Sequence, residues 1–132
     1  MLNRISIGNK IISLNEVDST NEFLKSYLLN HANEPEGLVI SAKSQYAGKG
    51  QRGNQWTSNS NENLTFSVLL QPGIDVSDQF VLTKIISLSI VDFFYYKGIN
   101  AKIKWPNDIY VDDKKIGGIL IENTVKQSLI KY

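Results

Sequence analysis

A glycine-rich loop at residues 48–56 carries the residue types best suited to chemistry; it reads Gly-Lys-Gly-Gln-Arg-Gly-Asn-Gln-Trp. Glycine lets the backbone adopt positive φ and approach a ligand closely, because it has no Cβ. Backbone N–H groups in such a loop form an anion-binding concavity, and Lys49 and Arg52 add positive charges. The loop therefore predicts binding of a phosphate or a carboxylate. The alternative is a mobile surface loop, which glycine-rich polar sequences often form.

The glycine spacing also matches the Gly-x-Gly-x-x-Gly string of dinucleotide-binding folds. That fingerprint requires a strand before the loop and a helix that opens inside it. Residues 37–42, Gly-Leu-Val-Ile-Ser-Ala, predict the strand, but residues 57–63 form a polar, turn-favouring tract in which no helix is expected. A Walker-type phosphate loop is absent as well. We therefore predict neither of these two nucleotide sites.

Further candidates for chemistry are Asn107 and Asp108 in a predicted turn and Lys115 beside the glycine pair 117–118. The chain has no cysteine and no apparent Ser/His/Asp set, so acyl-enzyme catalysis is not expected. The remaining groups suit phosphoryl or adenylyl transfer, in which lysines neutralise charge, a carboxylate holds Mg²⁺ and Trp56 stacks on a purine. Each has a structural alternative: a core tryptophan, an Asx-turn aspartate and a solvated hairpin lysine.

The bulk composition describes an ordinary globular chain. It has 132 residues, 42% hydrophobic and 20% charged, which predicts one domain with a real core. With a net charge of +1, recognition by charge must be local. No apolar run approaches the ~20 residues of a membrane span and no signal peptide is apparent, so a cytoplasmic protein is expected. His31 has no partners at metal-ligand spacing and is expected at a helix end.

The first half of the chain predicts a hairpin, a helix and two strands. Residues 4–14 read as the hairpin around a Gly-Asn turn. Ser19 and Glu22 match a capping box, so a helix is expected after them. Strands are expected at 37–42 and 63–70. The helix has one apolar face, made of Phe23, Leu24, Tyr27 and Leu28.

The second half predicts a long helix and more strands. The helix runs from Ser77 to a terminal glycine, Gly98, with a core stripe. A strand at 101–105 and a hairpin of 109–111 with 116–122 follow, and a β-like alternation at 128–132 stops without a turn, as expected for a chain cut inside a larger domain. The stripe consists of Leu82, Ile85, Ile86, Ile90, Phe93 and Phe94.

Taken together, motifs along the chain resemble the catalytic domain of biotin–protein ligases. They cover residues 10–123 and consist of Ser19-Thr20-Asn21, Gln45 with the glycine loop and Trp56, Lys-Trp-Pro-Asn-Asp at 104–108, and Lys-Ile-Gly-Gly-Ile-Leu at 115–120. The resemblance implies an α+β fold, a mixed β-sheet with packed helices as in class II aminoacyl-tRNA synthetases. Residues 1–132 would be the N-terminal portion of that catalytic domain.

The resemblance also implies a reaction and a set of site residues. Biotin and ATP–Mg²⁺ would form biotinyl-5′-adenylate, and biotin would then pass to a lysine of the biotin carboxyl carrier domain of a carboxylase. Lys115 and Lys49 would be the catalytic residues. The nucleotide would contact Lys49, Arg52, Trp56, Asn107 and Asp108, with Asp108 also meeting the metal. The biotin pocket would comprise Ser19, Thr20, Asn21, Gln45, Lys49, Gly50, Gln51 and Lys115.

The loop departs from the family pattern, which often reads Gly-Arg-Gly-Arg-Arg-Gly. Lys49 lacks the bidentate fork of arginine, and Gln51 removes a charge. A lipoate–protein ligase remains an alternative, although the motifs at 104–108 and 115–120 favour biotin. A non-catalytic biotin- or nucleotide-binding fragment is another. No DNA-binding domain precedes the ligase motifs, so neither DNA nor membrane is an expected partner, whereas a homodimer is consistent with the family.

Overall fold

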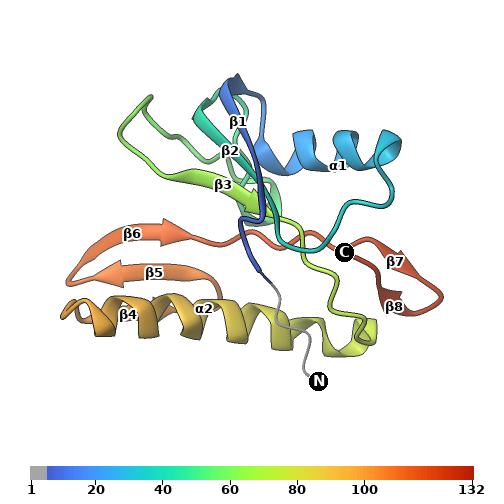
Figure 1. Cartoon of the computed structure of the whole chain (residues 1–132). Helices are drawn as coiled ribbons and strands as arrows, with labels where there is room; N and C mark the ends of the chain where they lie inside the picture. Colours follow the sequence, from blue (N-terminus) through green and yellow to red (C-terminus); the bar gives the residue numbers. More distant parts are fainter. Residues whose placement is uncertain (1–5) are drawn as a thin grey trace. The chain divides into compact units, whose positions relative to one another are not determined.

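The computed structural model describes residues 6–132, which fall into two compact units (Figure 1). The first comprises Met1–Gln71 with Tyr132, and the second comprises Pro72–Lys131. Strands and helices occur in both units, as an α+β chain requires. The assignment of residues 1–132 to one ligase-type domain stays a prediction.

The first unit is a three-stranded mixed sheet with one helix. Its strands are β1 (Lys10–Val17), β2 (Leu38–Gln45) and β3 (Thr65–Val68), in the order β1-β2-β3. β1 and β2 are parallel, and helix α1 (Thr20–Asn30) makes the crossover that parallel strands need. β3 returns antiparallel to β2. The predicted strand at 37–42 is thus confirmed and longer, whereas the one at 63–70 is shorter.

The core of this unit forms where α1 packs on the sheet. Its buried members come from α1, from β2 and from the residue that follows β3: Leu24, Leu28, Leu38, Ile40 and Leu69. Phe23 and Tyr27 are partly buried against this cluster, so the predicted apolar face of the helix is confirmed. Tyr132, near the end of the chain, packs against the same cluster.

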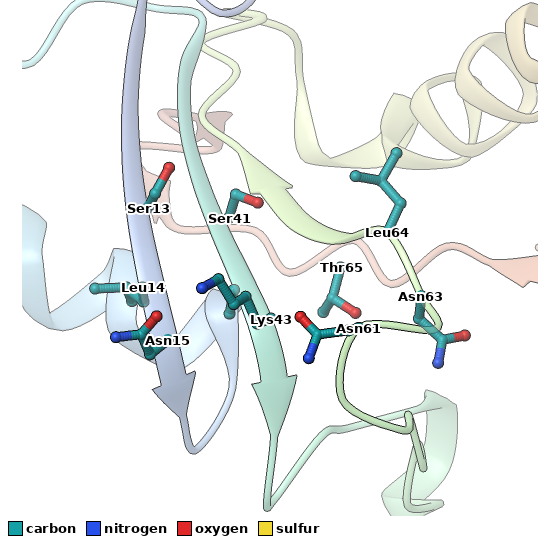
Figure 2. Close-up of a pocket in the computed structure, with 10 residues that line it drawn as sticks. Ser13, Leu14, Asn15, Ser41, Lys43, Asn61, Asn63, Leu64 and Thr65 are labelled. Atoms are coloured by element: carbon teal, nitrogen blue, oxygen red, sulfur yellow. The ribbon is translucent and has the colours of Figure 1, made fainter.

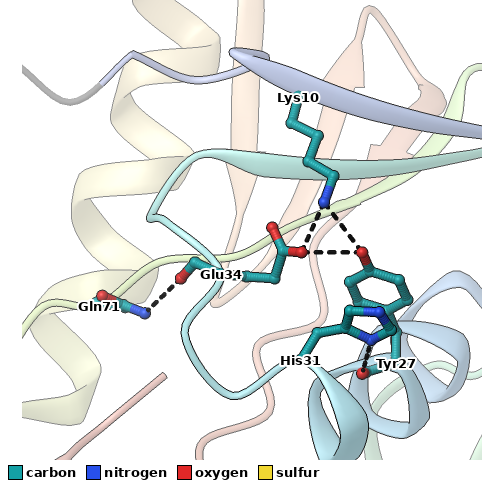
Figure 3. A network of polar contacts seen from close by, with 5 residues as sticks. All are labelled: Lys10, Tyr27, His31, Glu34 and Gln71. Atoms are coloured by element: carbon teal, nitrogen blue, oxygen red, sulfur yellow. Dashed lines mark hydrogen bonds and ion pairs between the residues drawn. The ribbon is translucent and has the colours of Figure 1, made fainter.

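A polar cluster ties β1 to the far end of α1 (Figure 3). Lys10 Nζ lies 2.6 Å from Glu34 Oε1 and donates to the Tyr27 hydroxyl at 3.0 Å. That hydroxyl in turn donates to Glu34 Oε1 at 2.9 Å. His31 stacks on the Tyr27 ring with centroids 3.9 Å apart, and its Nδ1 lies 2.9 Å from the Tyr27 carbonyl oxygen. His31 is the C-terminal cap of α1, as predicted.

The predicted hairpin at 4–14 is wrong within the described residues. Residues 4–5 lie outside them, and residues 6–7 are not strand. β1 instead pairs in parallel with β2, and the Gly8 N–H donates to the Gly37 carbonyl oxygen at 2.8 Å. The Gly-Asn turn therefore leads the chain along the start of β2, with Gly8 at a φ of +83° that glycine tolerates.

The second unit begins with a short 3₁₀ turn, η2 (Val76–Asp78), and continues as α2 (Gln79–Tyr96). Asp75 accepts a hydrogen bond from the Ser77 N–H at 2.8 Å and so caps this turn. The helix ends before Gly98, whose φ of +75° fits the predicted terminal glycine.

A three-stranded antiparallel sheet follows in the order β4-β5-β6 (β4 Ala101–Lys104, β5 Asp108–Val111, β6 Lys114–Gly118). The predicted hairpin exists, but its turn consists only of Asp112 and Asp113, and β6 ends at Gly118. Ile116 forms a bulge, because Tyr110 pairs with Lys115 while the preceding residue of β5 pairs with Gly117. The alternation near the chain end becomes a two-stranded hairpin, β7 (Val125–Lys126) and β8 (Leu129–Ile130).

The predicted core stripe on α2 is wrong for part of its length. Ile85 and Phe93 are each 56% exposed, and the other members of the stripe are only half-buried. Ser87 is the buried residue of this helix. Strands of four or five residues reach about 13–17 Å, so they cover little of a helix that is about 27 Å long.

The same helix amends the expectation about membrane spans. Residues 76–96 are long and apolar enough to cross a membrane, with a mean hydropathy of 1.2 and 6% of the window buried. Length and composition alone are weak criteria, because core helices of soluble proteins satisfy them too.

Candidate functional site

A polar network at the start of α1 brings together residues from three segments of the first unit. The Thr20 N–H donates to Gln45 Oε1 at 2.8 Å, and the Thr20 hydroxyl lies 3.2 Å from the same oxygen. The Ser67 hydroxyl donates to Thr20 Oγ1 at 2.7 Å and also contacts the side-chain oxygen of Asn21. The parallel β1-α1-β2 path places the first turn of α1 beside the end of β2, where Gln45 lies. Three predicted biotin-pocket residues thus share one network.

Ser19 precedes this network as the N-terminal cap of α1 and is buried. Its carbonyl oxygen accepts from the Phe23 N–H at 2.9 Å, but its side chain makes no capping hydrogen bond. The predicted capping box is therefore wrong, because the Glu22 carboxylate instead binds two lysines, Lys49 and Lys25.

Ser67 is a member of the network that the sequence analysis missed. It is only 6% exposed, whereas its neighbour Phe66 is 50% exposed. The partial alternation of β3 suggested an apolar inward face, but the inward positions here include the hydroxyl residues. Ser67 pairs with the buried Ile40 of β2. The sequence signal that could have identified Ser67 is the hydroxyl residue at every second position of β3, Thr65 and Ser67.

The glycine loop is hydrogen-bonded onto itself. The Gly50 N–H donates to the Asn54 carbonyl oxygen at 2.7 Å, and the Trp56 N–H donates to the Gly48 carbonyl oxygen at 2.8 Å. Between these bonds lies a single 3₁₀ turn, η1 (Gln51–Gly53), with Arg52 at a φ of +56°. No α-helix opens there, as the polar tract at 57–63 predicted.

The two cations of the glycine loop, Lys49 and Arg52, have different surroundings. Lys49 Nζ lies 2.8 Å from Glu22 Oε1, in the first turn of α1. This ion pair, ahead of the one with Lys25, holds the pKa of Glu22 below its usual range. Arg52 is exposed, and Trp56 is half-buried and so is not a core anchor.

In the second unit, Lys115 and Asp108 form an ion pair across β5 and β6. Lys115 Nζ lies 2.8 Å from Asp108 Oδ2, so Lys115 is a strand residue with a partner and not a solvated turn lysine. Asn107 is held by two bonds to Ile119: its side-chain Nδ2 donates to the Ile119 carbonyl oxygen at 2.7 Å, and its carbonyl oxygen accepts from the Ile119 N–H at 2.9 Å. The predicted residues of this unit are thus neighbours around the start of β5.

The described residues contain no group of three or more His, Cys, Asp or Glu side chains that could hold a metal. The carboxylate of Asp108 is already paired with Lys115.

A hollow of about 440 Å³ lies on the first unit, over the middle of β1 and β2 and beside the start of β3 (Figure 2). Serine, threonine and asparagine side chains line it together with Lys43 and Leu64. None of the predicted site residues contributes to this lining, so the hollow and the network around Thr20 are different places.

Comparison with known proteins identifies the relatives of this chain. The sequence profile of the biotin/lipoate A/B protein ligase family matches residues 14–131. The bifunctional ligase/repressor BirA of Escherichia coli K12 is 33% identical over 121 residues, which are 90% of this chain and 36% of the relative. The biotin–protein ligase of Homo sapiens is 34% identical over 124 residues, 88% of this chain and 17% of that protein.

Solved structures agree with these sequence relatives. The biotin protein ligase from Aquifex aeolicus in complex with biotin and ATP has a TM-score of 0.72 and 31% identity, and the match covers 92% of this chain and 49% of that one. The biotin acetyl coenzyme A carboxylase synthetase from Helicobacter pylori with bound biotinylated ATP has a TM-score of 0.66 at 27% identity, covering 91% and 56%. The chain spans well under half the length of the bacterial ligase/repressors it matches and about half of the solved chains.

The α+β structure of the chain and its sequence point to the same relatives. The expected α+β architecture of the biotin ligases is confirmed, and so is the resemblance drawn from the motifs. The chain belongs to the biotin/lipoate A/B protein ligase family, and its homologues are biotin–protein ligases.

Proposed function

We propose that this chain supplies biotin- and ATP-binding residues of a biotin–protein ligase. Such an enzyme forms biotinyl-5′-adenylate and then passes biotin to a lysine of the biotin carboxyl carrier domain of a carboxylase. The observation that carries the proposal is the network in which Thr20, Gln45 and Ser67 meet at the start of α1. Solved relatives in complex with biotin and ATP, or with biotinylated ATP, support the choice of ligands.

The network has the polarity that the ureido ring of biotin needs. That ring presents one carbonyl acceptor and two N–H donors, so its site must both donate and accept. The hydroxyls of Ser19 and Thr20 can do either, and the carboxamides of Asn21 and Gln45 carry both kinds of atom. The low exposure of Ser19 and Thr20 strengthens such bonds, because water competes less there.

The cations are proposed to act on the charges of adenylation. A biotin carboxylate oxygen attacks the α-phosphorus of ATP, one P–O bond forms, and the bond to the leaving pyrophosphate breaks. Negative charge on the phosphoryl oxygens is stabilised by Lys115 and by Lys49. In the second step the amine of the acceptor lysine attacks the acyl carbon, loses a proton, and AMP leaves.

The other residues of the set have positioning roles in this proposal. Gly50 and Gln51 cover biotin and the adenylate, Arg52 meets a phosphate, and Trp56 stacks on the adenine ring. Asn107 contacts the phosphates. Mg²⁺ enters with ATP as part of the substrate, and the Asp108 carboxylate is the protein oxygen available to it.

Biotin is preferred over lipoate on chemical grounds as well as by the names of the relatives. The dithiolane ring of lipoate has no hydrogen-bonding groups that match a ureido ring. A site built from buried hydroxyls and amides would leave those groups unpaired around lipoate, and unpaired buried polar groups weaken binding strongly.

The test is a calorimetric titration of this chain with biotin, with and without ATP–Mg²⁺, and with lipoate for comparison. Saturable biotin binding is expected, with at least a tenfold loss in Thr20→Val and in Lys115→Ala. Lys114→Ala is the matched control, because it removes the neighbouring β6 lysine. Equal binding of lipoate, or unchanged biotin affinity in a folded Thr20→Val variant, would contradict the proposal. Pyrophosphate exchange with ATP then separates a ligase from a binding module.

Partners and location belong to the same proposal. The acceptor is a carrier domain that presents one lysine, and the cytoplasm is where that domain and ATP are encountered together. Homodimer formation is proposed as well, and sedimentation of the chain with and without biotin and ATP measures it.

A further inference from the structure

One ion pair connects the glycine loop to the helix that carries the polar network. Lys49 Nζ lies 2.8 Å from Glu22 Oε1, and Lys25 Nζ lies 3.1 Å from the same oxygen. Glu22 follows directly after Thr20 and Asn21 in the first turn of α1. The carboxylate therefore stands next to the proposed biotin residues and holds a lysine that the loop would offer to an anion.

Other hydrogen bonds of the loop join backbone groups. Its own bonds close it on itself, between Gly50 and Asn54 and between Gly48 and Trp56. Its base is fixed where the Ala47 N–H donates to the Asp18 carbonyl oxygen at 2.9 Å. Beyond that base, the bond from Lys49 to Glu22 joins the loop to the first turn of α1.

The ion pair between Lys49 and Glu22 is weak enough to be exchanged for another partner. The side chain of Lys49 is 50% exposed and that of Glu22 is 33% exposed, and ion pairs at such exposure are weak. The charged carboxylate of Glu22 stays stabilised when Lys49 leaves, because Lys25 remains beside it and because a helix N-terminus favours a negative charge. Two ammonium groups around one carboxylate leave an excess of positive charge that attracts an anion.

We propose that Glu22 is a positioning residue of the glycine loop. Its carboxylate holds Lys49 in the ligand-free protein and releases it to the anionic group of the bound ligand. The inference rests on the proposed function, in which the ligand brings a carboxylate and later an α-phosphate to Lys49. Glu22 competes with that anion for the same ammonium group. The strength of the ion pair thereby sets how readily the loop accepts the ligand.

The first experiment compares biotin binding to the wild type and to Glu22→Gln, which keeps the size of the side chain and removes its charge. Biotin affinity is expected to rise two- to fivefold, mainly through faster association, since an exposed pair contributes at most about that factor. Glu16→Gln makes the same charge change in β1, where the carboxylate contacts the Ser44 hydroxyl, and is expected to leave the affinity unchanged. Unchanged or weaker binding in Glu22→Gln would overturn the proposal.

The second experiment reads the ion pair without any ligand. Trypsin must take the Lys49 side chain into its own acidic pocket, so cleavage after Lys49 requires release from Glu22. In Glu22→Gln this cleavage is expected to accelerate two- to fivefold relative to cleavage after Arg52 in the same chain. An unchanged ratio would refute the ion-pair role. Faster cleavage in a protein that binds no biotin in any variant would support that role while rejecting the proposed ligand.

Discussion

Thr20 is the residue through which the polar network of the first unit is joined. Its backbone N–H and its hydroxyl both reach Gln45 Oε1, and its hydroxyl also accepts from Ser67. Thr20→Val keeps the volume but leaves the buried Ser67 hydroxyl without this acceptor. Because Ser67 keeps its contact with the side-chain oxygen of Asn21, we expect a loss of about 0.5–1.5 kcal/mol in the free energy of unfolding, measured by urea denaturation. Thr57→Val, at an exposed position, should change it by less than about 0.5 kcal/mol.

Glu34 makes the stability of the first unit depend on acid pH. The ion pair with Lys10, and then the hydrogen bond from Tyr27, hold the pKa of Glu34 below its ordinary value. A carboxyl with a lowered folded-state pKa stabilises the protein above its unfolded pKa, and this contribution is lost as the pH falls through the folded value. The urea midpoint should therefore fall less steeply below about pH 4.5 in Glu34→Gln than in the wild type. An identical pH profile would contradict this role; Glu62→Gln serves as the control.

At the scale of elements, α1 offers a matched pair of leucines. Leu28 is 6% exposed in the core, whereas the adjacent Leu29 is 82% exposed. Leu28→Ala should lower the free energy of unfolding by about 2–5 kcal/mol, because it opens a cavity between α1 and the sheet. Leu29→Ala should stay within about 0.5 kcal/mol. Thermal and urea unfolding of the two variants measure the difference, and similar losses would mean that α1 does not pack as described.

The glycine loop offers a second pair. A Cβ at Gly48 would lie 2.5 Å from the Trp56 carbonyl oxygen, so the backbone must shift, whereas a Cβ at Gly53 would meet open space at a φ of +80°. Gly48→Ala is expected to cost about 1–3 kcal/mol and to change Trp56 fluorescence. Gly53→Ala should cost about 1–2 kcal/mol through φ strain alone and leave that fluorescence unchanged. A fluorescence change in Gly53→Ala as large as in Gly48→Ala would contradict this distinction.

Periodic elements were predictable from the sequence because their pattern is local. The apolar face of α1, the strand β2 and the hairpin β5–β6 follow from residue spacing and turn residues. The failures all depend on partners distant in sequence. The Glu22 carboxylate binds Lys49, which lies 27 residues further along the chain, instead of capping the helix, and β1 pairs with β2 instead of with the residues just before it. The exposure of α2 depends on how much sheet is available to cover it, which spacing cannot reveal.

The candidate site was predicted through residue types and motif order more than through geometry. Thr20, Asn21 and Gln45 do meet, and Lys115 does find a carboxylate. Ser67 escaped because a serine inside an apolar strand resembles an ordinary solvent-facing position until the register with Ile40 is known. Roles in binding and catalysis remain predictions, which the ligand titrations address.

At the scale of the whole molecule, net charge bears on the question of DNA. The Escherichia coli relative is named a ligase and repressor, but this chain carries a net charge of only +1. The exposed lysines of β4, Lys102 and Lys104, lie beside β5, where Lys104 is opposite Asp108, and the turn that follows β5 holds Asp112 and Asp113. Positive charge is therefore interrupted where the strands bring lysines together, and counterion release on DNA should be small.

We accordingly expect this chain to bind a duplex of mixed sequence no more tightly than about 10⁻⁴ M at physiological salt, the weak end of non-specific binding. Fluorescence anisotropy of a labelled duplex measures both the affinity and its salt dependence. The titration is repeated between roughly 50 and 200 mM salt, because affinity that depends on phosphate contacts falls steeply over this range. Asp112→Lys with Asp113→Lys converts the hairpin turn into a basic one and should raise both quantities, which shows that the assay detects a basic surface. Micromolar binding by the wild type, with a steep salt slope, would mean that local charge outweighs net charge and that this chain itself contributes to nucleic-acid recognition.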